Sequence, residues 1–271
     1  MDRYFCEQKI SGEQIELTGT EAHHLIHVMR ARAGRQVVVF DGFGGEYLAE
    51  IDQVRRDAAL LRLIEHRPIE RELPGRLVIA AALPKGDRQK WLVEKLVELG
   101  VSAFVPLTTQ RSVSEPGEAA RTRLARTVVA ASKQCGRNRL MEIAEAVEWT
   151  EFAVECRADI RLLAHPASAA AECFDSGSAS ALLPNDSGCC QTLPPLNVPS
   201  EIVAAVGPEG GFTDAEVAAA IQAQWICFDL GPRILRVETA ALVMAALCVD
   251  RLQQTAETPT PQCNETRKTN R

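Results

Sequence analysis

The sequence lacks the features that mark a membrane-spanning or secreted protein. No run of eighteen or more apolar residues occurs in its 271 residues, so we expect no spanning helix. The opening stretch MDRYFCEQKISGEQ has no apolar core of the kind that a secretory signal needs. The nine cysteines show no C-x-x-C spacing, and the chain is far too long for a disulfide scaffold. Scattered free thiols suit a reducing compartment, so we expect a cytoplasmic protein with no membrane partner.

An overall excess of positive charge is also missing. The net charge of −6 by itself argues against a nucleic-acid partner. Residues 85–142 nevertheless carry 11 basic and 6 acidic side chains, whereas residues 143–271 carry 8 and 17. Because salt screens each charge over roughly 10 Å, such a basic stretch can hold phosphates although the whole chain is acidic. Composition alone favours the plainer interpretation that these side chains line a solvated helix face.

The first part of the chain, up to about residue 72, has the pattern of a small β-barrel with one helix. Its strand patterns are QIELTG, RQVVVF, GEYLAEI and AALLRLIE, with a turn at DGFGG. Thr20 is the expected cap of the helix that interrupts them. The expected apolar face of that helix consists of Leu25, Val28 and Met29. A Pro-Gly pair at 74–75 follows, so we expect a barrel domain at 1–72 and a second domain at 73–253.

Strand and helix patterns alternate from residue 76 onward. They read RLVIAAAL, DRQKWLVEKLVEL, VSAFVPL, AARTRLARTVVAASKQ, DIRLLAH, EIVAAV and WICFDL. Repeated strand, helix and strand predict an α/β fold with a parallel sheet covered on both faces. The first of these helices is expected to be capped by Asp87 and to stop at Gly100. Its predicted apolar face consists of Trp91, Leu92, Leu96 and Leu99.

Two segments break this pattern. Residues 174–200 are rich in serine and proline and are expected to form a surface excursion. The polar tail at 254–271 is expected to be disordered.

A glycine-rich loop, GPEGG at 207–211, follows the strand pattern EIVAAV. Thr213 and Glu216 are spaced as a capping box that opens the next helix, so the loop lies at the carboxyl end of a parallel strand. The loop is not G-x-G-x-x-G and has no Walker lysine, and Glu209 would oppose a diphosphate. A nucleoside with a positive centre, such as S-adenosylmethionine, fits better. The alternative is a tight turn whose glycines serve only backbone geometry.

A second loop, GPRILR at 231–236, follows the strand pattern WICFDL. We expect the two strands to be adjacent, so both loops could converge on one pocket, where Ile234 and Leu235 could sandwich an adenine. Arg236 and Glu238 would then supply charge at the rim. The following stretch TAALVMAALCV is apolar nearly all round, which predicts burial, partly against a second subunit.

At these residues the chain resembles a known family. GPEGGFTDAEV and LGPRILRVETAAL look like the paired signatures of the RsmE family, methyltransferases that modify N3 of a uridine in 16S ribosomal RNA. HHLIHVMRARAGRQVVVFDG, LPKGDRQKWLVEKLVELGV and SKQCGRNRL are similar to the family in order and spacing, so the match reaches about residue 252. The resemblance implies a SPOUT-type α/β domain with a deep C-terminal trefoil knot, preceded by a PUA-like barrel. It also implies a homodimer that binds S-adenosyl-L-methionine at the knot and acts on 16S rRNA of the small ribosomal subunit.

The resemblance also carries a set of cofactor-binding residues over to this chain. They are Leu163, Ala164, His165, Gly207, Pro208, Glu209, Gly210, Leu230, Gly231, Ile234 and Leu235. His165 is equally well explained as an ordinary histidine at a strand end. Glu209 either attracts the sulfonium or amino group or ties the loop together by hydrogen bonds.

The catalytic candidates are Arg236 and Glu238. N3 of uracil carries a proton at neutral pH, so methylation needs that proton removed or the developing anion stabilised. Arg236 could stabilise charge on the carbonyl oxygens, and Glu238 could take the proton. Alternatively, Glu238 only complements the dipole of the helix that it begins. No cysteine is placed as a nucleophile, so we expect direct in-line transfer without a covalent intermediate.

The expected RNA contacts lie in loops around the basic stretch and on the barrel. They are Lys85, Arg88, Arg111, Arg137, Asn138 and Arg139, with Arg30, Arg32 and Arg35 as a second surface. Some of these are expected to be ordinary solvated charges. His23 and His27 are spaced by four but lack a third ligand, so we predict no metal.

Three other functions fit the sequence less well. A non-enzymatic RNA-binding protein of the same fold would not need the glycine loop or the pair Arg236 and Glu238. A SPOUT enzyme acting on transfer RNA or ribose is closer, but the barrel and the CGRNR stretch favour the ribosomal enzyme. A nucleotide-dependent dehydrogenase is disfavoured because no strand ends in a dinucleotide glycine pattern.

Overall fold

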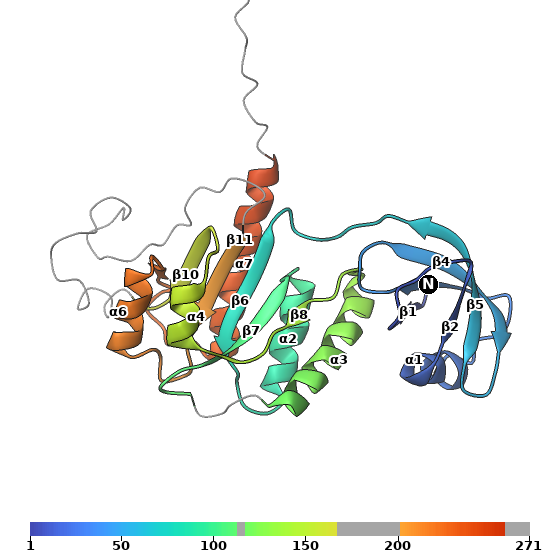
Figure 1. Ribbon diagram of the computed structural model, residues 1–271, viewed down its shortest axis with the longest axis horizontal. Coiled ribbons are helices and arrows are strands. Elements are labelled where there is room, and N and C mark those ends of the chain that lie inside the picture. The colour runs from blue at the N-terminus through green and yellow to red at the C-terminus, as the bar shows by residue number, and fades with distance from the viewer. Residues whose placement is uncertain (113–116, 167–200, 258–271) are drawn as a thin grey trace, which may run out of the picture.

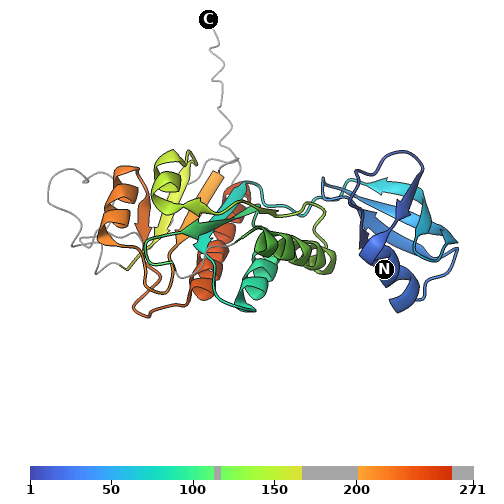
Figure 2. The same ribbon diagram turned by 60° about the horizontal axis from the view of Figure 1, so that its bottom comes forward.

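The computed structural model describes residues 1–112, 117–166 and 201–257, which form two separate β-sheets flanked by helices (Figure 1). The first sheet belongs to the N-terminal domain, residues 3–67, and the second to the residues from 76 onward. Figure 2 shows the N-terminal domain attached to one end of the larger one. The expected excursion at 174–200 and nearly all of the expected tail lie outside the described residues.

The N-terminal domain is built on a mixed five-stranded sheet in the order β1-β3-β4-β5-β2. Its strands are β1 (Arg3–Phe5), β2 (Gln14–Leu17), β3 (Gln36–Phe40), β4 (Glu46–Val54) and β5 (Ala59–Arg67). The four strands expected from the sequence are confirmed. β1 was not expected, because its three residues are too few for an alternating pattern and its parallel pairing with β3 is non-local.

The helix of this domain differs from the expected one. Helix α1 (Gly19–His23) runs into a π-helical turn, η1 (His24–Val28), in which the amide of Met29 donates to the carbonyl of His24 at 2.9 Å. The cap position is Thr18 rather than Thr20. Leu25 is buried as expected, but Val28 is 58% exposed, because the wider π-helical turn moves it away from the core.

The second sheet is parallel throughout, with the strand order β12-β10-β11-β6-β7-β8 and with β9 also paired to β7. The strands are β6 (Arg76–Ala82), β7 (Ala103–Thr108), β8 (Glu142–Ile143), β9 (Val147–Glu148), β10 (Ile160–Ala164), β11 (Glu201–Val206) and β12 (Ile226–Phe228). The expected parallel α/β fold is therefore confirmed.

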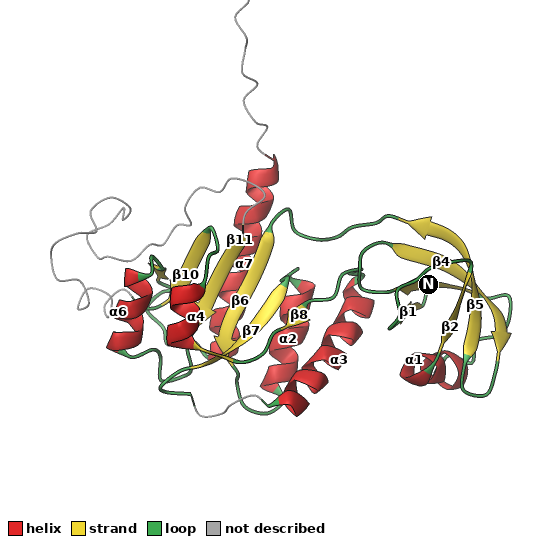
Figure 3. Cartoon of the chain, viewed as in Figure 1, coloured by secondary structure: helices red, strands yellow, loops and turns green. Residues whose placement is uncertain are grey.

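Helices cover both faces of this sheet (Figure 3). They are α2 (Arg88–Glu98), α3 (Glu118–Cys135), α4 (Trp149–Glu155), α6 (Asp214–Gln222) and α7 (Val237–Glu257). Alternate residues of β6 divide between two cores: Leu77 and Ile79 pack with α2, α3 and α7, whereas Val78 packs with α4 and α6. This alternation is why a continuous apolar run forms a strand buried on both faces.

Helix α2 agrees with its pattern in extent but not in every side chain. It ends at Glu98, with Gly100 two residues beyond, and Leu92 and Leu96 are fully buried as expected. Trp91 is 46% exposed instead of buried. Asp87 occupies the cap position, but its side chain makes no capping hydrogen bond.

Strands β11 and β12, expected to be neighbours, are separated by β10. Leu163 of β10 lies in register with Ala205 on one side and with Cys227 on the other. The two glycine loops therefore flank the end of β10 instead of following adjacent strands. Sequence patterns identify strands, but their order depends on packing between distant segments.

Helix α7 is only partly buried. Met244, Ala245 and Cys248 face the core, whereas Val243 and Leu247 are exposed along the opposite side. Within the described ranges, no helix is both long and apolar enough to cross a membrane.

Candidate functional site

Three chain segments meet at the carboxyl edge of the second sheet, beyond β10, β11 and β12. Ala164 is in register with Val206 of β11 and with Phe228 of β12, so the residues that follow all three strands lie side by side. The amide of His165 donates to the carbonyl of Phe228 at 3.1 Å and extends the β12 pairing by one step. Open parallel sheets bind their ligands beyond the carboxyl ends of their strands.

The first loop is held by the expected capping box. The Glu216 amide donates to Thr213 Oγ1 at 3.3 Å, and Glu216 Oε2 accepts from the Thr213 amide at 2.7 Å. Glu216 is completely buried, and its second oxygen accepts from the Gln110 amide at 2.9 Å. Gly207 packs closely against Phe212, because a Cβ there would lie 3.0 Å from the Phe212 ring. The capping box and the buried Glu216 side chain therefore hold the backbone of this loop in a fixed position.

Arg111 braces this loop from outside. Its guanidinium donates to the carbonyl of Gly210 at 2.6 Å and to that of Phe212 at 3.3 Å. The side chain is exposed, so it stands at the surface beside the site while holding the loop in place.

The second loop turns at Gly231, whose φ of +95° requires glycine. The Gly231 amide donates to Asp229 Oδ1 at 2.8 Å. Leu230 and Leu235 pack against the core beneath the loop, whereas Ile234 is 98% exposed. Of the two residues expected to sandwich an adenine, only Leu235 is therefore anchored within the chain.

The two catalytic candidates differ in environment. Arg236 is exposed at the end of the second loop, and its carbonyl accepts from the Ala240 amide at 2.9 Å. Glu238 lies in the first turn of α7, and its side chain is only 8% exposed. Its Oε1 lies 3.3 Å from the guanidinium of Arg88, while its Oε2 is buried without a hydrogen-bond partner.

Arg88 connects this carboxylate to the first loop. It is the first residue of α2, and the same guanidinium nitrogen lies 3.7 Å from Glu209 Oε1. From the sequence, Arg88 was expected to contact RNA. Its pairing with Glu238 could not be foreseen, because two residues 150 positions apart leave no local pattern.

His165 stands between the two loops at the end of β10. Its burial lowers the pKa of the imidazole, and this outweighs the opposing effect of Asp214 and Asp229. The ring is therefore neutral at physiological pH, where it can accept as well as donate a hydrogen bond.

Two of the expected RNA-binding residues are instead internal. Arg137 and Asn138, on the loop after α3, are 4% and 0% exposed. Arg137 pairs with Glu72 and donates to the carbonyls of Val97 and Val101 at 3.1 and 2.9 Å. Both side chains are fully engaged within the protein, so neither can contact RNA in this structure.

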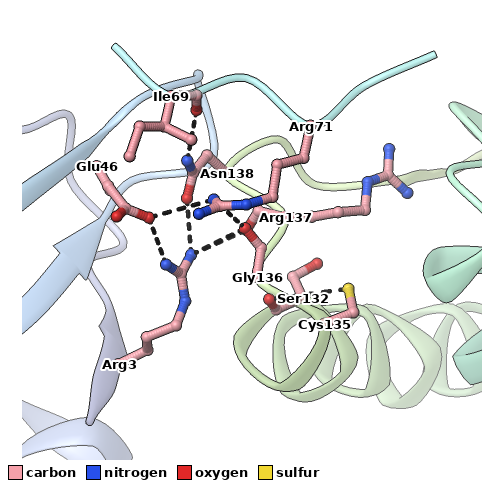
Figure 4. Close-up of polar contacts among 9 residues, drawn as sticks. All are labelled: Arg3, Glu46, Ile69, Arg71, Ser132, Cys135, Gly136, Arg137 and Asn138. Atoms are coloured by element: carbon pink, nitrogen blue, oxygen red, sulfur yellow. Dashed lines mark hydrogen bonds and ion pairs between the residues drawn. The ribbon is translucent and has the colours of Figure 1, made fainter. Parts of the chain in front are cut away.

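Asn138 belongs to a polar cluster that joins the two domains (Figure 4). Its Oδ1 accepts from Arg3 at 2.7 Å, and its Nδ2 donates to the carbonyl of Ile69 at 2.7 Å. Arg3 also pairs with buried Glu46 at 2.5 Å, which Arg71 contacts at 3.3 Å. The CGRNR stretch thus attaches the N-terminal domain to the end of α3.

The other expected RNA-binding side chains are exposed. Lys85 lies between β6 and α2, and Arg139 forms an exposed pair with Glu70 at 3.0 Å. The three barrel arginines are Arg30, Arg32 and Arg35. The described residues contain no group of three or more metal-ligating side chains, and the rings of His23 and His27 lie 4.8 Å apart at the surface.

A cavity of about 350 Å³ lies elsewhere, between the first turn of α3 and β7. Its wall includes Leu83, Pro106, Leu124 and Ile143, with Arg121 among its polar groups. None of the three converging loops lines it, so the geometry of the strand ends, not the size of this cavity, locates the site.

Comparison with known proteins agrees with this arrangement. A family model described as an RNA methyltransferase domain matches residues 71–249, and one described as an RNA methyltransferase PUA domain matches residues 17–64. Ribosomal RNA small subunit methyltransferase E of Bacillus subtilis is 33% identical over 253 residues, which cover 89% of this chain and 93% of that protein.

Solved structures show the same likeness. The crystal structure of a ribosomal RNA small subunit methyltransferase E from Neisseria gonorrhoeae bound to S-adenosyl methionine is 26% identical, with a TM-score of 0.75, covering 91% of this chain and 95% of that one. A protein from Legionella pneumophila, solved with the bound cofactor SAM, is 26% identical with a TM-score of 0.74, covering 93% and 96%.

Proposed function

The chain belongs to the ribosomal RNA small subunit methyltransferase E family, and from this membership we propose that it methylates N3 of a uridine in 16S ribosomal RNA. It is an S-adenosylmethionine-dependent ribosomal RNA methyltransferase. The observation that carries the proposed chemistry is Glu238, a buried carboxylate beside the three converging loops with one oxygen unpartnered.

The residues at the strand ends fit S-adenosylmethionine. Leu230 and Leu235 offer an apolar wall, and the Glu209 carboxylate suits a positive group. Neutral His165 lies between the loops, where its imidazole can hydrogen-bond the bound nucleoside. When bound, the cofactor supplies a methyl group on a sulfonium whose sulfur keeps the electron pair of the broken bond.

Glu238 and Arg236 act on the acceptor base. Glu238 Oε2 takes the N3 proton of uracil, and the electron pair left on N3 forms the new bond to carbon. Arg236 stabilises the negative charge that develops on the carbonyl oxygens of the ring. A positioned base contributes about 10²–10⁴-fold to the rate. No covalent intermediate between protein and RNA forms in this scheme.

The RNA lies against exposed basic side chains of both domains. Lys85, Arg111 and Arg236 stand near the carboxyl edge of the second sheet, while Arg139 lies at the domain junction. The PUA-like domain, for which we keep the boundary at 72/73, adds Arg30, Arg32 and Arg35 as a second contact surface. Phosphate contacts of this kind fix the register of the RNA, while the base is read at the site.

We further propose a C-terminal trefoil knot and a homodimer, with the enzyme at work in the cytoplasm. The proposal of the knot rests on membership of the family, and the connection from β11 to β12, which passes β10 in the sheet, is where it would lie. Exposed Val243, Leu247 and Ile234 support the dimer, because a second subunit would cover them. Sedimentation would measure the oligomeric state.

The test is methyl transfer from labelled S-adenosylmethionine to unmodified small subunits and to free 16S RNA, followed by nucleoside analysis. We expect 3-methyluridine, and we expect Arg236→Ala to abolish it while cofactor binding persists. Arg157→Ala is the control, because this exposed arginine precedes β10 at the opposite edge of the sheet.

Each other outcome has a distinct meaning. Cofactor binding without methyluridine would move the substrate to another RNA. Absence of cofactor binding would leave an RNA-binding protein of the same fold. A trapped covalent adduct would refute direct transfer.

A further inference from the structure

We propose that Arg88 is a positioning residue for Glu238, and that the pair together selects uracil over cytosine at the acceptor position. The inference rests on the proposed function and names how the same site recognises its base. Arg88 is thereby removed from the RNA contacts, since its guanidinium is committed to two carboxylates of the protein.

The junction draws on three elements that are distant in sequence. Arg88 opens α2, Glu209 belongs to the first glycine loop, and Glu238 lies in the first turn of α7. One guanidinium nitrogen lies 3.3 Å from Glu238 Oε1 and 3.7 Å from Glu209 Oε1. Arg88 therefore ties the loop at the cofactor site to the helix that carries the base.

Glu238 requires this partner because it is buried. Its side chain is 8% exposed, and a carboxylate so far from water is strongly disfavoured unless it is paired. Arg88 and the amino end of α7 supply positive charge on one side. If Arg88 turned away to bind a phosphate, Glu238 would lose its only ion-pair partner among the described residues.

The arrangement leaves one oxygen free for one donor. Glu238 Oε2 is buried without a partner, so a ligand that supplies a single N–H at this point would complete its hydrogen bonding. Uracil has one N–H in its ring, at N3, between two carbonyl oxygens. Cytosine has a lone pair at N3, which would face the carboxylate and leave both acceptors unpaired. A site built to bond an N–H rejects analogues that lack it far more strongly than a site that only fits their shape.

The first experiment separates positioning from phosphate binding. We expect Arg88→Met to lower kcat by about tenfold to a hundredfold, because the Glu238 carboxylate loses the partner that orients it. KM for RNA and the cofactor Kd should stay within about threefold of wild type, since the contact of Arg88 with exposed Glu209 is longer, at 3.7 Å. Lys90→Met is the matched control, since this exposed lysine stands two residues along the same helix. Its kcat should not change, and any loss of phosphate attraction should appear in KM.

A second set of variants tests the pairing itself. Glu238→Gln should lower kcat by about 10²–10⁴-fold and leave cofactor binding intact, and adding Arg88→Met to it should lower the residual kcat no further, because the two side chains act as one unit. Guanidinium ion added to Arg88→Ala should restore part of the lost kcat. On a synthetic RNA with cytidine at the target position, wild type should bind more weakly than on the uridine RNA, and Glu238→Gln should reduce that difference, since its amide can donate to N3 of cytosine.

Two results would overturn the inference. A higher KM for RNA in Arg88→Met with unchanged kcat would make Arg88 a phosphate contact. Loss of cofactor binding in the same variant would mean that Arg88 acts through Glu209. Failure of the proposed function is distinguishable, because wild type would then form no methyluridine at all.

Discussion

Arg137 and Arg139 offer a test of burial within one loop, because they lie two residues apart and differ mainly in their surroundings. The sequence gives both the same expected role, contact with RNA. In the structure, Arg137 has a side chain that is 5% exposed, whereas that of Arg139 is 52% exposed. We expect Arg137→Ala to destabilise the protein strongly and Arg139→Ala to leave its stability almost unchanged.

The magnitude follows from what each arginine contacts. Arg137 pairs with Glu72 at 2.5 Å and satisfies the carbonyls of Val97 and Val101 near the end of α2. Removing one partner of a buried ion pair costs about 3–5 kcal/mol, and because the Glu72 side chain left behind is 20% exposed, we expect a loss near the lower end of that range. Arg139 forms only an exposed pair with Glu70, which is worth about 0–1 kcal/mol.

The assay is urea unfolding followed by tryptophan fluorescence. All three tryptophans, at positions 91, 149 and 225, belong to the second domain, so the signal reports the unfolding of that domain. For a domain of this size, 1 kcal/mol corresponds to roughly 2–4 °C in Tm, so thermal unfolding should separate the two variants by at least about 4 °C. RNA affinity, measured on the same samples, should fall for Arg139→Ala.

Equal losses of stability in the two variants would refute the reasoning. So would an Arg137→Ala protein that is as stable as wild type but binds RNA less tightly. Arg137→Lys is a useful third variant, because an ammonium cannot reproduce the fork that holds Glu72, and an intermediate loss is expected.

Three further predictions concern single residues. Burial raises the pKa of Glu46, but the hydrogen bonds and charges of Arg3 and Arg71 outweigh this and hold the pKa below its ordinary value of 4.5. The contribution of the Glu46 carboxylate to stability should therefore be complete above pH 4.5 and be lost as the pH falls through the lower pKa of the folded state. Glu46→Gln should flatten this acid dependence in urea titrations. Burial raises the pKa of the Cys248 thiol to about 12, so iodoacetamide at pH 8 should modify this residue only after unfolding. Modification of Cys248 in the native protein, detected by peptide mass analysis, would contradict this. Gly207→Ala places a Cβ 3.0 Å from the Phe212 ring, so we expect overpacking to lower the free energy of unfolding by about 1–3 kcal/mol in urea titrations, and unchanged stability would contradict this.

The elements of the second domain could be read from the sequence because their signals are local. Continuous apolar runs such as RLVIAAAL form strands when both faces of a sheet are covered, and the Thr213 capping box acts within four residues. The two glycine loops were also recognisable, since each combines a strand end with a helix start. The N-terminal domain was harder, because β1 is only three residues long and a π-helical turn shifts the face of α1.

The candidate site depends on both levels. Local sequence determined which residues stand at strand ends and helix starts, including Glu209, Arg236 and Glu238, because turn and cap chemistry act over a few residues. Only the tertiary structure placed β10 between β11 and β12, buried Arg137 and set Arg88 against Glu238. These outcomes depend on contacts between segments up to 150 residues apart. Burial decides whether an arginine binds RNA or an internal carboxylate, and a residue becomes buried only when those distant segments have packed together.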